Sequence, residues 1–171
     1  MAVGMALTAC GDDDNGGKNT PPSIDDLTFS IAEDVPIGTV VETVEATDEE
    51  QDALSFAITE GNTDEAFAIN AELRQLVTAK KLDFEKIPRY VLVVTVSDGQ
   101  IAVTANITID LEDVNEAPTI APEQNFTVKE DAANGTAVGT VLATDPEEDD
   151  LTFSITEGNT GNAFAIAEGT G

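Results

Sequence analysis

The stretch LSFAITEGNTDEAFAI, residues 54–69, decides how this chain is organised, because it reappears as LTFSITEGNTGNAFAI at residues 151–166. The offset between the two copies is 151 − 54, or 97 positions. The same offset, applied without gaps, aligns Pro21 with Pro118, Phe29 with Phe126, and Thr47-Asp48 with Thr144-Asp145. A period of about one hundred residues is the length of a whole domain and is too long for a solenoid unit. The sequence therefore predicts tandem copies of one domain.

The second copy is shorter than the first. Position 171 corresponds to 171 − 97, so this copy stops at the counterpart of Arg74. We expect residues 23–116 to form one full repeat and residues 117–171 to form a truncated second repeat of a longer protein. A copy without its last strands is expected to have open sheet edges.

Apolar and polar residues alternate along the first copy with the period of a β-strand. The seven expected strands lie near residues 27–31, 38–47, 54–58, 67–69, 76–79, 90–96 and 105–111. A one-residue slip within residues 38–47 predicts a bulge, and no segment has a helical period. Seven short strands in under about a hundred residues predict an all-β, Greek-key sandwich of immunoglobulin-like type.

The composition is strongly acidic. Asp and Glu number 34 against 7 Lys and Arg, a formal net charge of −27, which argues against nucleic-acid binding. Such a charge repels itself unless something offsets it. Two interpretations stay open at this point, namely a solvated acidic surface and carboxylates that gather divalent cations.

The rarest residues narrow the chemistry further. The chain has no His and one Cys, which excludes an intramolecular disulfide, zinc sites built on His or Cys clusters, and His-based catalytic triads. A hard cation with oxygen ligands is the metal chemistry that this composition supports. Apolar residues make up 41% of the chain and aromatic residues 5%, so we expect an aliphatic core with Phe as the large filler.

The N-terminal segment has a pattern of its own. Residues 1–9 are small and apolar. Their last three residues form, with the residue that follows, the motif Leu7-Thr8-Ala9-Cys10, which resembles the lipobox of bacterial lipoprotein signal peptides. The resemblance implies a signal-peptide remnant at 1–9, with its true start further upstream, and lipidation of Cys10. It also implies a lipid-anchored protein of the outer membrane or cell surface of a Gram-negative bacterium. Residues 10–22 are rich in Gly, Asp, Asn and Pro, which is typical of a disordered tether. The alternative is a chance Cys in a frayed terminus.

Acidic motifs recur at the strand ends of the first copy. They are Ala32-Glu33-Asp34, Ala46-Thr47-Asp48-Glu49-Glu50, Leu82-Asp83-Phe84-Glu85, Val96-Ser97-Asp98-Gly99 and Asp113-Val114-Asn115-Glu116. Calcium requires about six to eight oxygen ligands, which converging loops can supply and one loop cannot. Side chains two positions apart share a face in an extended segment. Leu111 is expected to point inward, so Asp113 and Asn115 are expected on the same side of the strand as Leu111.

These motifs together resemble the cadherin repeat, over about residues 23 to 171. Further carriers are Ala143-Thr144-Asp145, the alternating run from Tyr90 to Asp98, and the Ala117-Pro118 that follows Glu116. In that family calcium lies between successive repeats and is held by the far end of one repeat, the linker and the near end of the next. The resemblance therefore implies Ca²⁺ as the cofactor.

Carried over by position, the resemblance implies eight metal ligands at the joint between the copies. They are Glu33, Asp83, Glu85, Asp113, Asn115, Glu116, Asp145 and Glu147. Glu116 and Glu147 stand where the family usually has Asp, and Ala117 stands where it usually has Asn, which removes one side-chain ligand. Asp48, Glu50 and Asp98 form the matching half-site at the other end of the first copy, which we expect to be empty or very weak.

The resemblance predicts a calcium-stiffened, cadherin-like surface protein for adhesion or ligand presentation. Its expected partners are the membrane, through the lipid anchor, and other surface proteins or glycans. One alternative is a spacer or carbohydrate-binding accessory module of a larger surface enzyme, and another is a calcium-free sandwich with ordinary loop acids. A third, an enzyme that uses paired carboxylates as acid and base, is not favoured, because these acids lie at domain ends.

Overall fold

Two long strands that form a hairpin support the first copy. In this computed structural model, which describes residues 18–167 and 169, they are β8 (Arg89–Ser97) and β9 (Ala102–Glu112). They pair antiparallel from Ser97 opposite Ala102 to Arg89 opposite Asp110. Gly99, at the turn between them, has a φ of +94°, which glycine adopts without strain. The chain therefore turns at Asp98-Gly99 between the two strands.

The first sheet grows outward from this hairpin. β5 (Ser55–Glu60) pairs antiparallel with β8, and β2 (Leu27–Ala32) pairs parallel with β9. The order across the sheet is β2-β9-β8-β5. Because β2 and β9 are parallel, they end together, at Ala32 and Glu112, and the segments that follow them begin side by side.

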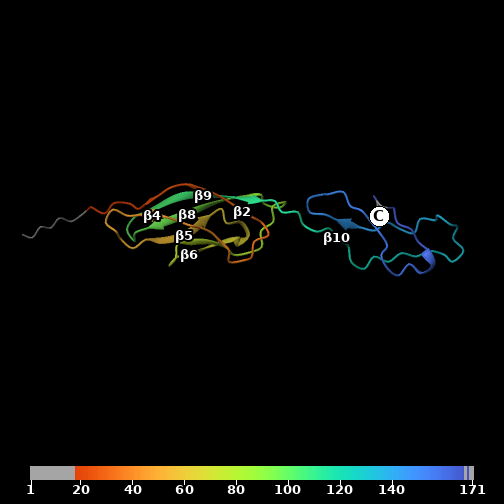
Figure 1. Ribbon diagram of the computed structural model, residues 1–171. Coiled ribbons are helices and arrows are strands. Elements are labelled where there is room, and N and C mark those ends of the chain that lie inside the picture. The colour runs from red at the N-terminus through yellow and green to blue at the C-terminus, as the bar shows by residue number, and fades with distance from the viewer. Residues whose placement is uncertain (1–17, 168, 170–171) are drawn as a thin grey trace, which may run out of the picture.

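A second sheet packs against the first (Figure 1). It has the order β3-β7-β6, from β3 (Val40–Thr43), β7 (Gln75–Thr78) and β6 (Phe67–Asn70). The short strands β1 (Ser23–Ile24) and β4 (Ala46–Thr47) form a separate pair. The two layers make the expected all-β sandwich of immunoglobulin-like type.

The core between the sheets is aliphatic, as the composition predicts. Its fully buried side chains include Leu76, Leu92, Val94, Val96, Ile107 and Ile109. Phe67 and Tyr90 pack edge to face with ring centroids 5.0 Å apart, at an interplanar angle of 82°. This geometry is favourable for aromatic pairs and fills the space that small side chains leave.

One expected strand is divided in the structure. Residues 38–47 form β3 and β4, separated by Val44 and Glu45, and the register of β3 against β7 shifts between Val40 and Glu42, in keeping with the predicted bulge. Val44 is fully buried and its N–H donates to the carbonyl oxygen of Arg74 at 2.8 Å. Val44 is thus both buried in the core and hydrogen-bonded to the residue just before β7. The pair β1–β4 was not expected.

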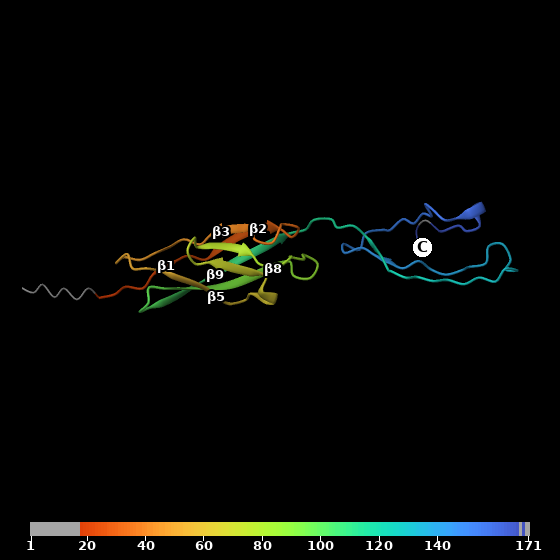
Figure 2. The same cartoon turned by 90° about the horizontal axis from the view of Figure 1, so that it is seen from below.

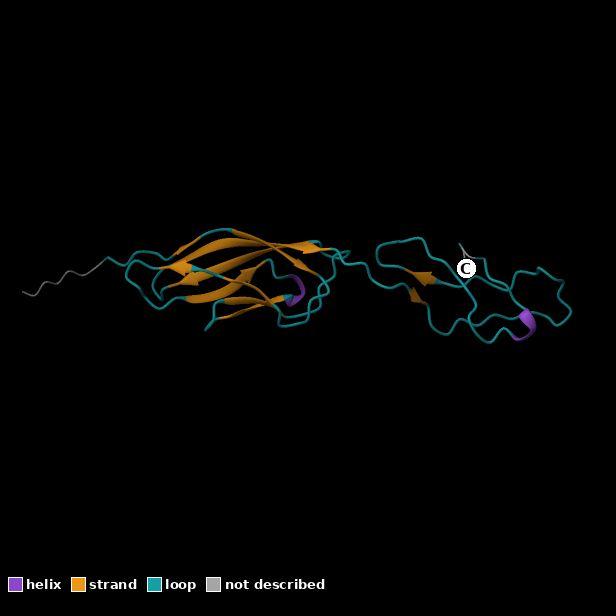
Figure 3. Cartoon of the chain, in the orientation of Figure 1, coloured by secondary structure: helices purple, strands orange, loops and turns teal. Residues whose placement is uncertain are grey.

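The second copy has little regular structure (Figure 3). Its strands β10 (Thr119–Ile120) and β11 (Ala143–Thr144) pair with each other, and a 3-10 turn, η2 (Thr160–Asn162), follows later. In the first copy, β5 and β2 are held by β8 and β9, whose counterparts would lie 97 positions later, past residue 171. Among the described residues, the counterparts of β2 and β5 therefore lack the strands that pair with them in the first copy.

The register of the short strands corrects the gapless alignment of the two copies. Ile24 pairs with Ala46, whereas Ile120 pairs with Ala143. The offset is therefore 120 − 24, or 96, at β1 and 143 − 46, or 97, at β4. This makes Pro22, and not Pro21, the counterpart of Pro118, and it makes Asn19 and Thr20 the counterparts of Asn115 and Glu116.

Candidate metal centre

Carboxylates from four segments meet at the far end of the first sandwich, where β2 and β9 end. Figures 1 and 2 show the two copies end to end with an extended linker between them. Glu33 follows β2, Asp113 and Glu116 follow β9, Glu85 lies in the loop before β8, and Glu147 follows β11 in the second copy. We call these five residues the far-end acids.

Glu33 ties three of these segments together. It is 1% exposed, and its carboxylate accepts the N–H of Phe84 at 2.6 Å on Oε2 and the N–H of Val114 at 3.0 Å on Oε1. Its own N–H donates to the carbonyl oxygen of Glu112 at 3.2 Å. The Glu33 side chain thus fixes the 82–85 loop and the start of the linker around the end of β2.

The far-end acids form two overlapping trios. In each trio, one carboxylate oxygen per residue lies within 4.8 Å of the other two. The first trio is Glu33, Glu85 and Asp113, and the second is Glu85, Glu116 and Glu147. Glu85 belongs to both trios and therefore connects a cluster within the first copy to a cluster that spans both copies.

Glu147 is the contribution of the second copy. Its Oε1 accepts the N–H of Glu116 at 3.0 Å, while its Oε2 is buried without a hydrogen-bond partner among the described residues. A buried acceptor without a partner is costly, and a cation would satisfy it. The five carboxylates of the far-end acids, together with the unpartnered oxygen of Glu147, fit the all-oxygen ligand set of Ca²⁺.

Charge crowding is visible in the titration of Glu85. Its own backbone N–H lowers the pKa of Glu85, but desolvation and the negative charges of Glu33, Asp113 and Glu147 outweigh this, so the pKa is raised above its usual value. Like charges that disfavour the ionised form mark a place where a positive ion would be stabilised. Glu85 is therefore the electrostatic centre of the far-end acids.

The other three predicted ligands lie outside both trios. The Oδ1 of Asp83 accepts the N–H of Lys86 at 2.8 Å, and the Oδ1 of Asp145 accepts the N–H of Asp149 at 3.2 Å. The Nδ2 of Asn115 donates to the carbonyl oxygen of Glu116 at 3.0 Å. These side chains support turns and the linker here, and their metal ligation stays a prediction.

Lys81 was missed by the sequence analysis. Its Nζ lies 2.8 Å from the Oε1 of Glu116, a member of the second trio. The search for ligands considered side chains that offer an oxygen atom, so a lysine next to the Leu82-Asp83-Phe84-Glu85 motif was passed over. The signal was available, because Lys81 lies four positions before Glu85 in the sequence.

The other end of the sandwich has three acids, Asp48, Glu50 and Asp98, which we call the near-end acids. Asn19 Nδ2 donates to the Oδ2 of Asp98 at 2.9 Å, and Thr20 Oγ1 donates to the Oε2 of Glu50 at 2.7 Å. Asn19 and Thr20, which the sequence analysis assigned to the tether, thus contact the first copy. Within the described residues, the near-end acids do not form a trio of the far-end kind.

These donors act on the titration of the near-end acids. The backbone N–H of Ile101, the Asn19 amide and the N–H of Gln100 lower the pKa of Asp98. The Thr20 hydroxyl lowers the pKa of Glu50. Asp48 differs, because its Oδ1 accepts the N–H of Asp52 at 3.0 Å while its Oδ2 is buried without a partner among the described residues.

The same linker contact occurs at both ends. The N–H of Thr20 donates to the Oε2 of Glu50 at 3.3 Å, and the N–H of Glu116 donates to the Oε1 of Glu147 at 3.0 Å. Glu147 is the counterpart of Glu50 at the 97 offset, and Glu116 is the counterpart of Thr20 at the 96 offset. In each copy, the segment before the first strand therefore contacts that copy through an equivalent hydrogen bond.

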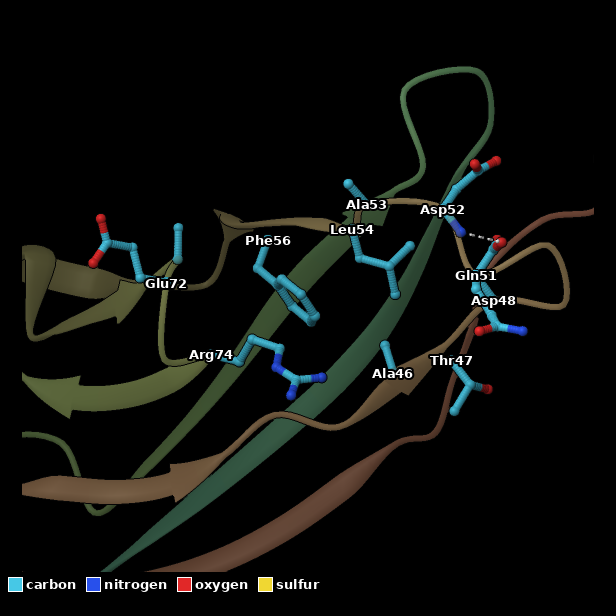
Figure 4. Close-up of a pocket in the computed structure, with 11 residues that line it drawn as sticks. Ala46, Thr47, Asp48, Gln51, Asp52, Ala53, Leu54, Phe56, Glu72 and Arg74 are labelled. Carbon is cyan, nitrogen blue, oxygen red and sulfur yellow. Dashed lines mark hydrogen bonds between the residues drawn. The ribbon is translucent and has the colours of Figure 1, made fainter.

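A hollow of about 460 Å³ opens beside the near-end acids. Figure 4 shows the Arg74 side chain lying between Phe56 and Ala46, with Asp48 and Asp52 along the rim. Arg74 also pairs with Glu45 at 3.7 Å. This arginine gives the hollow a mixed charge, so its chemistry differs from that of the all-acidic trios.

The predicted membrane attachment concerns the N-terminal segment. Residues 1–9 and Cys10 lie outside the described residues, so their assignment stays a prediction. Across residues 18–167 and 169, no helix has the length and apolar character needed to cross a bilayer.

Comparison with known proteins confirms the resemblance to cadherin repeats. The family model described as Cadherin domain matches residues 27–112, which is 86 of the 171 residues. Human Protocadherin-15 is 36% identical over 159 residues, and the match covers 87% of this chain and 8% of that protein. The Protocadherin-like wing polarity protein stan of Drosophila melanogaster is 34% identical over 151 residues, covering 83% of this chain and 4% of that protein. The chain therefore spans less than a tenth of the length of these relatives.

Solved structures agree with the sequence relatives. The human Protocadherin-24 EC1-2 structure, form II, superposes with a TM-score of 0.63 at 25% identity, covering 89% of this chain and 78% of that one. Mouse Cadherin-23 EC22-24 superposes with a TM-score of 0.59 at 26% identity, covering 90% of this chain and 52% of that one. The chain belongs to the cadherin domain family, whose domains are non-enzymatic, extracellular modules of adhesion type.

Proposed function

We propose that this chain is a calcium-binding adhesion module in which the cation joins the two copies at the far-end acids. The observation that carries the proposal is the position of Glu85, whose carboxylate belongs both to a trio within the first copy and to a trio completed by Glu147 of the second. A cation at such a place has ligands from both copies. Binding it would therefore oppose their separation and stiffen the joint.

Charge supports the same function. The chain has a formal net charge of −27, and the five far-end acids concentrate part of it in one place. A bound Ca²⁺ supplies positive charge and accepts oxygen ligands in flexible geometry. Glu33, Glu85, Asp113, Glu116 and Glu147 would hold it. An ion that binds the folded state alone also stabilises it, by an amount that grows with the logarithm of the free ion concentration once this exceeds Kd.

The experiment is a calorimetric calcium titration of the full chain and of two matched variants. Glu85→Gln removes the residue that both trios share, whereas Glu72→Gln makes the same charge change at an exposed turn outside the trios. We expect the wild type and Glu72→Gln to bind calcium alike and Glu85→Gln to bind it at least tenfold more weakly, equivalent to about 1.4 kcal/mol. Absence of calcium binding by the wild type would overturn the proposal.

We also propose that the module is displayed on a bacterial surface through a lipid on Cys10. The support is the Leu7-Thr8-Ala9-Cys10 motif, in which small residues precede a thiol that can be acylated. Other surface proteins or glycans are the proposed adhesion partners. Expression in a Gram-negative host should place the protein in the membrane fraction with labelled lipid attached. Cys10→Ser should release it, and an unchanged distribution of that variant would contradict the anchor.

A further inference from the structure

Lys81 lies beside the calcium ligands that we propose. Its Nζ is 2.8 Å from the Oε1 of Glu116, which belongs to the trio shared by the two copies. The next residue, Leu82, is 1% exposed and anchors this segment in the core. The backbone of Lys81 is therefore fixed next to the trio, although its side chain is 72% exposed and can leave the pair.

The neighbouring lysines behave differently. Lys80 lies 3.5 Å from Glu65 and Lys86 lies 3.1 Å from Asp64, and neither acid belongs to a trio. In the part of the chain that the structure describes, Lys81 is the basic residue that forms an ion pair with a trio carboxylate. Lys86 therefore offers a matched control with the same chemistry in the same region.

A divalent cation and the Lys81 ammonium would compete for one carboxylate. Calcium lies about 2.3–2.6 Å from its oxygen ligands, while the ammonium already lies 2.8 Å from Glu116 Oε1. Two cations bound to the same carboxylate repel each other, so calcium would either displace the lysine or bind more weakly beside it. Both outcomes reduce calcium affinity.

We propose that Lys81 is an internal competitor that sets the calcium affinity of the joint by pairing with Glu116 when no cation is bound. The inference rests on the proposed function and adds to it the residue that tunes it. Exposed ion pairs are weak, so removing this one should tighten calcium binding by about two- to fivefold. With Lys81 in place, the joint releases calcium at a higher calcium concentration than its carboxylates alone would dictate.

The test is calcium calorimetry on the full chain for the wild type and three variants. Lys81→Gln should bind calcium about two- to fivefold more tightly, whereas Lys81→Arg, which keeps the charge, should bind like the wild type. Lys86→Gln should also match the wild type. Equal or weaker binding by Lys81→Gln overturns this inference and leaves the proposed function intact, whereas a wild type that binds no calcium overturns both.

Thermal unfolding gives a second readout that a merely structural role would not produce. With a chelator present, Lys81→Gln should unfold at the same or a lower temperature than the wild type, because it has lost an ion pair. With saturating calcium, it should unfold at a higher temperature, because tighter binding stabilises the folded state more. A Lys81→Gln effect of the same sign in both conditions would overturn the competition.

Discussion

Acids gather at both ends of the first sandwich, five at the far end and three at the near end, and their surroundings differ. At the near end, protein donors reach two of the acids, since Asn19 bonds Asp98 and Thr20 bonds Glu50. At the far end, carboxylates face one another in two trios. The difference teaches that acidic residues at strand ends do not by themselves make a cation site. What matters is whether three carboxylates come close enough to share one ion.

Titration follows the same division. Donors lower the pKa of Glu50 and Asp98 at the near end, whereas crowding raises the pKa of Glu85 at the far end. Hydrogen bonds to a carboxylate favour its charged form, and neighbouring negative charges disfavour it. Donors thus stabilise the charged forms of Glu50 and Asp98 at the near end. At the far end, an added cation would offset the repulsion between neighbouring carboxylates.

The largest effect is expected from Glu33, the buried member of the far-end acids. Glu33→Ala leaves the N–H groups of Phe84 and Val114 without their acceptor in a buried place, which should lower the free energy of unfolding by about 3 kcal/mol. Urea unfolding followed by circular dichroism measures this. The matched near-end change, Glu50→Ala, removes an exposed acid and should barely move the urea midpoint. Equal losses at both ends would remove the distinction between them.

Calcium affinity should separate the ends next. Asp113→Asn keeps the shape of a side chain in the first trio but removes its charge, and we expect calcium affinity to fall about tenfold, or about 1.4 kcal/mol. Asp98→Asn makes the same change at the near end and should leave calcium affinity of the joint unaltered. Calorimetry on both variants decides the matter. A similar loss in Asp98→Asn would place the dominant site at the near end.

Much of the first copy could be predicted from its sequence, because strands with one buried face have a period of two. The break at Val44 could not, because it depends on a contact with Arg74, 30 positions away. The offset of 96 at β1 and β10 also needed the strand register, since the proline pairs 21–22 and 118 align plausibly in two ways. The break at Val44 and the offset at β1 thus both depend on contacts between segments that are distant in the sequence.

The repeated turn shows where local information ends. Gly61 and Gly158 share a φ of +76°, and the Asn that follows each makes the same pair of hydrogen bonds to a Phe five positions on. A Cβ on Gly61 would lie 1.8 Å from the carbonyl oxygen of Val91 in β8, whereas a Cβ on Gly158 would meet nothing within 4 Å. The conformation of the turn is therefore determined by its local sequence, because both copies adopt it. Its packing depends on β8, which only the first copy contains among the described residues.

The same limit applies to the candidate site. The resemblance to the cadherin repeat led to Glu33, Glu85, Asp113, Glu116 and Glu147. In the structure these acids come together where parallel β2 and β9 end side by side. Sequence position could not show that Asp83 and Asp145 accept backbone N–H groups of nearby turns. It also could not show that Lys81 reaches Glu116 across 35 positions.

Stability as a function of pH should differ between the ends by a smaller amount. Because the pKa of Glu85 is raised on folding, the folded protein binds more protons above the usual value of about 4.5, and the contribution of Glu85 to stability falls as pH rises through that window. In chelator, Glu85→Gln should therefore gain stability relative to the wild type as the pH rises through and above about 4.5. Urea midpoints at several pH values measure the gain. Parallel curves for the two proteins would show that crowding does not act on Glu85.

The smallest effect is expected at the near end, from Thr20→Val. The variant loses the hydroxyl that lies 2.7 Å from the Oε2 of Glu50 and lowers its pKa, so the pKa of Glu50 should rise toward its usual value. NMR titration of side-chain carboxyl carbons follows Glu50 and Glu85 in one sample, with Thr28→Val, an exposed strand change, as the control. Glu50 contributes stability above its unfolded pKa and loses it as pH falls through the folded value, so the variant should lose that contribution at a higher pH. A shift in Glu50 without one in Glu85 would show that the ends titrate independently, each controlled by its own neighbours.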